Sequence, residues 1–99
     1  MHRYRFGALE FSWDDRKAQQ NDRRHKVRFE EAATVFADPL ARLYDDPDHS
    51  VDEARFLLVG HSAAGRVLLV VHAEKGDIVR IISARRPTSR ERARYEADA

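Results

Sequence analysis

The sequence contains no cysteine among its 99 residues. Disulfides, thiol nucleophiles and zinc sites built on cysteine are therefore excluded, and the composition fits a reducing compartment. Residues 1–5 lack the apolar stretch of a signal peptide, so we expect a cytoplasmic protein. No apolar run approaches the roughly 20 residues of a membrane-spanning helix. We therefore predict no membrane partner.

The sequence is also poor in glycine, with four in the whole chain. It has no G-x-x-x-x-G-K-[ST] loop and no G-x-G-x-x-G loop, so nucleotide-cofactor chemistry has no support. The G-x-S-x-G turn that carries the nucleophile of many hydrolases is missing too. We predict no cofactor.

Arginine dominates the charged residues that are present. Fifteen of the 18 basic side chains are arginine, although the formal net charge is only +1. Six of these arginines lie within residues 80–94, where Glu91 is the one acidic residue. Guanidinium groups match phosphate oxygens bidentately and keep their charge at any working pH. The segment predicts a phosphate-bearing partner, although a solvated surface explains any single arginine equally well.

The apolar pattern predicts one domain over residues 1–99, of the α+β class. Apolar residues recur at helical spacing within 29–36, and Thr88 with Glu91 forms a T-x-x-E capping box. We expect helices packed on one face of an antiparallel sheet of about four strands. The predicted order is a strand (6–13), two helices (14–25, 29–36), four strands (40–44, 55–59, 66–72, 78–84) and a helix from residue 88.

The first predicted helix has a polar stripe. Lys17, Asn21 and His25 are spaced i, i+4, i+8, and Arg24 lies beside them. A histidine can move a proton near neutral pH, so the stripe could face a substrate and bind phosphate. A solvent-exposed helix whose last turn carries cations to suit its dipole explains the same pattern.

Two further groups of charged residues could carry chemistry or structure. Glu53 and Arg55 point to the same side, either as a base beside a phosphate clamp or as an edge-strand ion pair. Arg80 lies within an apolar strand, where an unpaired charge is costly. Its face is therefore either open to a ligand, or the side chain reaches an edge of the sheet. Whether His72 lies near Arg80 depends on the hairpin register.

An acidic cluster in the middle of the chain could hold a divalent cation, because carboxylates and imidazole are suitable ligands. Its spacing matches no calcium loop, so a solvated acidic loop is the default interpretation and no metal site is predicted. The cluster consists of Asp45, Asp46, Asp48, His49, Asp52 and Glu53.

Read together, several segments resemble the BrnT family of toxins from type II toxin–antitoxin pairs. Their order and spacing cover about residues 10–96, so residues 1–9 are an N-terminal extension of unassigned role. The segments are Phe11-Ser12-Trp13-Asp14 with Lys17, Asn21 and His25; Phe29-Glu30-Glu31-Ala32 with Phe36 and Asp38-Pro39; Asp48-His49-Ser50 with Glu53, Arg55-Phe56 and Gly60; and Ile82-Ser83-Ala84-Arg85-Arg86 with Thr88, Glu91 and Tyr95.

The resemblance implies a RelE-like, barnase-related fold and a ribonuclease that needs no metal. It also implies an antitoxin of the BrnA type with a ribbon-helix-helix domain, in a heterotetramer of two toxins and two antitoxins. Operator DNA would be bound only through that antitoxin. Lys26 and Arg28 depart from the family, which usually has glycine and a small capping residue at these positions.

The resemblance also implies which residues act. The reaction expected is attack of an RNA 2′-hydroxyl on the adjacent phosphorus, with Glu53 or His25 as base. A non-catalytic, arginine-rich binding module is the alternative, and a metal nuclease using the acidic cluster is a third hypothesis. The catalytic candidates are Lys17, His25, Glu53, Arg55, Arg85 and Glu91, and the candidates for binding flanking phosphates are Arg66, Arg80, Arg86, Arg90, Arg92 and Arg94.

Overall fold

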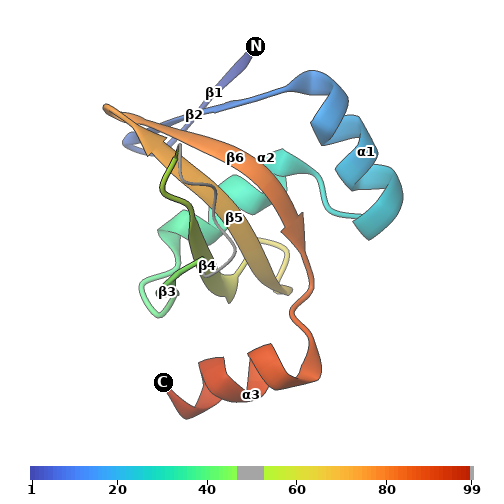
Figure 1. The fold of residues 1–99 in the computed structure, drawn as a ribbon, viewed down its shortest axis with the longest axis vertical. Coiled ribbons are helices and arrows are strands. Elements are labelled where there is room, and N and C mark those ends of the chain that lie inside the picture. The colour runs from blue at the N-terminus through green and yellow to red at the C-terminus, as the bar shows by residue number, and fades with distance from the viewer. Residues whose placement is uncertain (47–52, 99) are drawn as a thin grey trace.

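A computed structural model describes residues 1–46 and 53–98 (Figure 1). Strands and helices follow the order expected for an α+β protein. Within the described residues they are β1 (His2–Phe6), β2 (Leu9–Trp13), α1 (Asp15–His25), α2 (Phe29–Thr34), the 3-10 turn η1 (Val35–Ala37), β3 (Arg42–Asp45), β4 (Phe56–His61), β5 (Val67–Lys75), β6 (Ile78–Arg85) and α3 (Ser89–Ala97).

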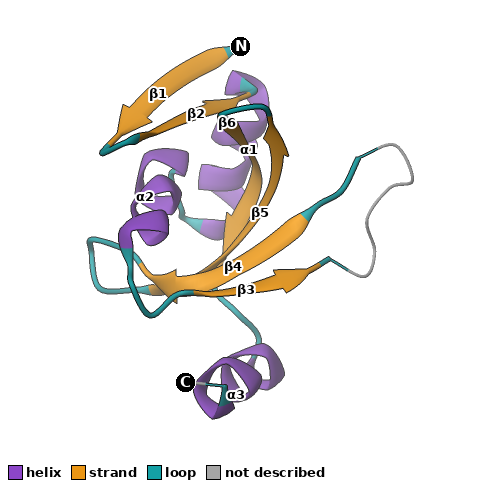
Figure 2. Cartoon of the chain, turned by 90° about the vertical axis from the view of Figure 1, so that its left-hand side faces the viewer, coloured by secondary structure: helices purple, strands orange, loops and turns teal. Residues whose placement is uncertain are grey.

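One mixed sheet joins all of these strands, in the order β1-β2-β6-β5-β4-β3. The four predicted strands β3 to β6 do pair antiparallel. The expectation of about four antiparallel strands was nevertheless imprecise, because β2 runs parallel to β6 and β1 adds a further edge strand. The parallel pairing was not predicted, since α1 and α2 separate β2 from the rest of the sheet in the sequence (Figure 2).

The N-terminal extension is part of this sheet. The strand predicted for residues 6–13 is confirmed over Leu9–Trp13, which form β2, but its start was placed too early, because the chain turns back at Gly7 and residues 2–6 form β1. Gly7 has a φ of 61°, in the left-handed region that glycine adopts without strain, and Phe6 pairs with Leu9 across the turn. Apolar residues continue on both sides of Gly7, so the sequence pattern did not indicate a turn there.

The ends of the helices are formed by the predicted residues. Asp14 caps α1 by accepting from the Lys17 amide at 3.0 Å, and the Thr88 capping box opens α3. Lys26 ends α1 with a φ of 59°, so a lysine adopts the left-handed conformation that glycine adopts more readily at the end of a helix. Arg28 begins α2 without a side-chain cap.

The two faces of the sheet carry separate apolar clusters. On one face α1, α2 and η1 cover the larger cluster, which includes Phe11, Phe29 and Leu68. On the other face Tyr95 of α3 packs against Val59, Val67 and Leu69. We call this second face, only part of which α3 covers, the α3 face (Figure 2).

The register also settles where His72 lies. His72 pairs with Ile81 on the face covered by α2, where its ring meets Phe36 edge to face with centroids 4.8 Å apart. Arg80 pairs with Ala73 and projects from the other face. The two residues are therefore neighbours in register but do not share an environment.

Among the described residues, no helix is long and apolar enough to cross a membrane.

Candidate functional site

A bulge in β6 decides which arginines share a face. Arg80 and Arg85 are five positions apart, so a regular strand would point them to opposite faces. The register shifts at the Val71/His72 step of β5, where Ile82 of β6 is left without a partner. Beyond this extra residue, Arg85 pairs with Leu69 and so projects from the α3 face, as Arg80 does.

Glu53 holds two arginines at the end of this face that is nearer the β5–β6 turn. Its carboxylate accepts a hydrogen bond from Nη2 of Arg80, and Nε of Arg55 lies 3.9 Å from the same oxygen. The side chains of Arg80, Glu53 and Arg55 are 26%, 30% and 34% exposed, so a ligand can still reach them. Leu57 of β4 pairs with Val71, and both pack on the α3 face. Arg55 is two positions before Leu57, so it projects from the same face.

Arg85 and Glu91 form a bidentate ion pair at the other end of the face. Nη1 and Nη2 of Arg85 donate to the two carboxylate oxygens of Glu91 at 2.8 and 3.0 Å. This pairing, with the Thr88 amide, lowers the pKa of Glu91 to about 2, and the hydrogen bond to Glu91 raises the pKa of Arg85. Glu91 is therefore ionised at neutral pH and joins α3 to β6, while Arg85 keeps further N–H donors for a ligand.

Lys17 and His25 line a hollow of about 260 Å³ beside the edge of β6, with Arg24 between them in sequence and Ser83 at the strand. Asn21 of the same stripe points inward instead. Its side-chain amide donates to the Ala84 carbonyl at 2.8 Å and accepts from the Ala84 amide at 3.0 Å. It thereby fills the role of a neighbouring strand along the part of β6 that β2 does not reach.

Arg66 lies away from these groups, where its guanidinium has protein partners. Its Nε donates to Glu31 at 2.9 Å, and its Nη2 donates to the Lys26 carbonyl at 3.0 Å. The hydrogen bond from Arg66 and a second from Ser62 lower the pKa of Glu31. Arg66 thus joins the β4–β5 turn to α2.

The remaining predicted cations surround α3. Arg86 and Arg92, together with Arg66, line a hollow of about 370 Å³ with His61. Arg94 stacks over the Tyr44 ring, with its guanidinium carbon 4.6 Å from the ring centroid, and Arg90 is exposed. These arginines do not share one hollow.

The structure therefore brings the predicted residues together in four groups. Two lie at opposite ends of the Arg80–Arg85 stretch on the α3 face, and the third, Lys17 with His25, borders Ser83 at the edge of that stretch. The fourth, Arg66 with Arg86 and Arg92, lines a separate hollow. Sequence reasoning missed Ser83 and the bulge at Ile82, because nothing in an apolar strand pattern marks an extra residue.

The acidic cluster is described only in part. Asp48, His49 and Asp52 lie outside the described residues. Within residues 1–46 and 53–98, no three His, Asp or Glu side chains gather as metal ligands.

Comparison with known proteins identifies the family. Residues 13–91 match the family model described as the ribonuclease toxin, BrnT, of type II toxin–antitoxin systems. No curated protein matches the sequence significantly. The fold is similar to the 1.1 Å crystal structure of the Brucella abortus ribonuclease toxin BrnT, with a TM-score of 0.59 and 20% identity over 78% of this chain and 94% of that one. The chain accordingly belongs to the BrnT family of ribonuclease toxins from type II toxin–antitoxin systems.

Proposed function

We propose that this toxin is a metal-independent endoribonuclease whose RNA substrate lies along β6 on the α3 face. The bulge at Ile82 carries the proposal, because it aims Arg80 and Arg85 at the same side of the sheet. The stretch between them is roughly 15 Å long, so an RNA backbone laid along it meets both arginines. Cations spaced in this way bind successive phosphates, which is how single-stranded RNA is held irrespective of sequence.

In the proposed reaction the RNA 2′-hydroxyl attacks the adjacent phosphorus. The products are a cyclic phosphate and a free 5′-hydroxyl. Such a reaction needs a base, cations for the charge that develops on phosphorus, and an acid for the leaving oxygen. Because Arg55 and Arg85 lie at opposite ends of the Arg80–Arg85 stretch, the proposal has two candidate centres. At one end Glu53 takes the proton and Arg55 stabilises the charge; at the other end His25 takes the proton, Arg85 stabilises the charge and Lys17 assists. In either centre the leaving 5′-oxygen takes a proton from the protonated base or from water.

The other predicted residues have supporting roles in this proposal. Glu91 orients Arg85 rather than exchanging protons, because the pKa of about 2 keeps it ionised. Arg80 binds a flanking phosphate. Arg86, Arg90, Arg92 and Arg94 extend the basic surface around α3, and Arg66 braces the fold through Glu31.

A protein antitoxin and an RNA target follow from the family. We extend this to a BrnA-like ribbon-helix-helix antitoxin, two copies of which assemble with two toxins, and to operator DNA bound through the antitoxin alone. A neighbouring gene for a ribbon-helix-helix protein that neutralises the toxin on co-expression would support this assignment.

Two matched variants test the role of Arg85. Arg85→Ala and Glu91→Gln both remove the Arg85–Glu91 ion pair, but only Arg85→Ala removes the cation. Glutamine at position 91 can still accept from the Thr88 amide. We expect Arg85→Ala to abolish RNA cleavage and growth inhibition, while Glu91→Gln retains a large part of both.

Circular dichroism shows whether each variant is folded. Normal cleavage by folded Arg85→Ala would remove Arg85 from the mechanism. RNA binding without cleavage by the wild type would favour the non-catalytic module instead.

A further inference from the structure

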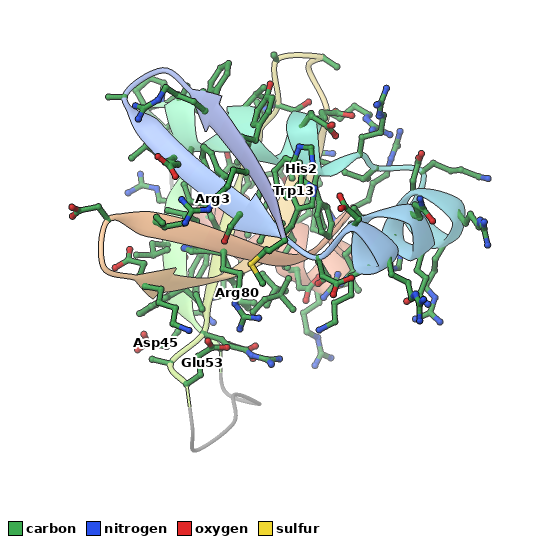
Figure 3. All side chains as sticks on the ribbon, turned by 90° about the horizontal axis from the view of Figure 1, so that it is seen from above. His2, Arg3, Trp13, Asp45, Glu53 and Arg80 are labelled. Carbon is green, nitrogen blue, oxygen red and sulfur yellow. The ribbon has the colours of Figure 1, made fainter. Side chains whose placement is uncertain are left out.

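A further hollow, of about 340 Å³, lies on the α3 face where the β1–β2 hairpin meets β6. Arg3, Ser12, Lys75, Glu53 and Arg80 line it. Figure 3 shows Arg3, Arg80 and Glu53 following one another along this side of the molecule. The hollow therefore begins at Arg80 and Glu53, where the proposed RNA path along β6 ends.

The sheet register explains why these side chains meet. Arg3 pairs with Ser12, and Ser12 pairs with Arg80, so the three residues form a row across three adjacent strands. Paired residues project from the same face, and strands lie about 4.8 Å apart, so Arg3 is roughly 10 Å from Arg80 in this row. The other side of β1 faces the core, where His2 stacks on Trp13 at 4.9 Å.

Positive charge exceeds negative charge around this hollow. Glu10 is shared by Arg3 and Arg5, as Glu53 is shared by Arg80 and Arg55. One carboxylate between two guanidiniums leaves a net positive charge and several free N–H donors.

Lys75, on the same side, makes no ion pair with any residue that the structure describes. Together with the serine hydroxyl of Ser12, these groups suit the oxygen atoms of a phosphodiester chain.

We infer that this hollow is an additional RNA-backbone subsite, in which Arg3 and Lys75 bind phosphates of the chain beyond Arg80. The inference rests on the proposed function, since it extends the same RNA path. Arg3, Glu10 and Ser12 precede residues 13–91, which match the family model, so the β1–β2 hairpin supplies this subsite from outside the matched region. Arg3 and Lys75 add affinity for long RNA and take no part in cleavage.

Binding of 2′-O-methyl RNA tests the subsite, because this RNA lacks the attacking hydroxyl and is not cleaved. Two lengths are compared, about four and about twelve nucleotides, within the range that single-strand-binding domains cover. The variant is Arg3→Gln/Lys75→Gln, and the matched control is Arg23→Gln, which removes an exposed arginine of α1.

We expect the double variant to bind the long RNA several-fold more weakly than the wild type. The slope of log affinity against log salt should fall by about 1.4, because each lost phosphate contact on a single strand contributes about 0.7. Its affinity for the short RNA and its rate of cleaving a short RNA should match those of the wild type. The control should bind both lengths normally.

Equal affinity of the double variant and the wild type for long RNA would overturn the subsite, even where Arg85→Ala abolishes cleavage. An equal loss of affinity for the short RNA would overturn it too, since the residues would then belong to the central path. Absence of cleavage by the wild type, with the length-dependent loss of binding intact, would instead overturn the proposed nuclease and support the subsite as a binding site.

Discussion

Shared carboxylates orient the arginines of the α3 face. Glu53 lies between Arg55 and Arg80, and the carboxylate of Glu91 accepts hydrogen bonds from Nη1 and Nη2 of Arg85. Partly exposed ion pairs of this kind contribute little to stability, so their main effect is on position. This arrangement lets a chain with a net charge of +1 present a basic surface, because acids bind between cations instead of covering them.

His72 is a buried histidine for which we expect a pH dependence of stability near neutrality. Its side chain is almost wholly buried between Phe36 and Phe56, and its Nδ1 has no hydrogen-bond partner among the described residues. Burial lowers the pKa of His72, because the charged imidazolium is poorly solvated in the core. The folded state therefore prefers the neutral ring.

We expect the free energy of unfolding to fall as the pH drops below about 6.5, the ordinary histidine pKa. Below that pH the unfolded chain binds a proton at His72 that the folded chain does not bind. The free energy of unfolding is therefore highest above about pH 6.5 and decreases on acidification. The maximum slope from one such group is about 1.4 kcal/mol per pH unit.

Urea titrations of the wild type and His72→Phe between neutral and mildly acidic pH measure this effect. Phenylalanine does not titrate, so the variant should show a shallower loss of stability. The same slope in both proteins would show that another group is responsible.

Among the elements, α1 presents one set of residues to a surface hollow and another to the backbone of β6. Its outer positions Lys17 and His25 border the hollow beside Ser83, while Asn21 between them bonds to the β6 backbone. The helix thus positions candidate catalytic groups through a single buried amide. Asn21 also donates to the Val27 carbonyl at 2.9 Å, which ties the end of α1 to the start of the next helix.

We predict that Asn21→Ala destabilises the protein by about 2 kcal/mol or more. The change leaves the Ala84 amide and carbonyl without their partner, and buried polar groups left unpaired cost about 1–3 kcal/mol each. Gln19→Ala, an exposed change on the same helix, is the control and should alter stability little. Equal midpoints of urea unfolding for both variants would contradict the role assigned to Asn21.

The helices and the four later strands could be predicted from the sequence, because each has its own local signal. Thr88 with Glu91, Asp14 and the spacing of apolar residues in 29–36 marked the helices correctly. The β1–β2 hairpin could not be predicted in the same way. Ala8 and Leu9 continue the apolar pattern through the turn, and only the left-handed φ of Gly7 reveals it.

The site could be predicted only as a set of residue types. Regular alternation along residues 78–85 puts Arg80 and Arg85 on opposite faces, and the bulge at Ile82 reverses that expectation. The ionic partners of Arg66 and Arg80 also lie far away in sequence, at Glu31 and Glu53. Contacts between residues so far apart produce no local sequence pattern. The sequence alone therefore does not indicate which arginines are free to bind a ligand.

At the scale of the whole molecule, the sheet separates the main apolar core from the proposed RNA path. The face covered by α1 and α2 holds most of the core (Figure 2). The other face carries the Arg80–Glu53 and Arg85–Glu91 pairs. RNA bound there would be held by Arg80 and Arg85 of the sheet and by Arg55, which directly precedes β4.

The products of RNA cleavage by the purified toxin in EDTA test the central claim of a metal-independent nuclease most directly. The account predicts undiminished cleavage, with a 2′,3′-cyclic phosphate on one fragment and a free 5′-hydroxyl on the other. Loss of cleavage in EDTA with recovery on adding a divalent cation, or fragments that carry a 5′-phosphate, would contradict it.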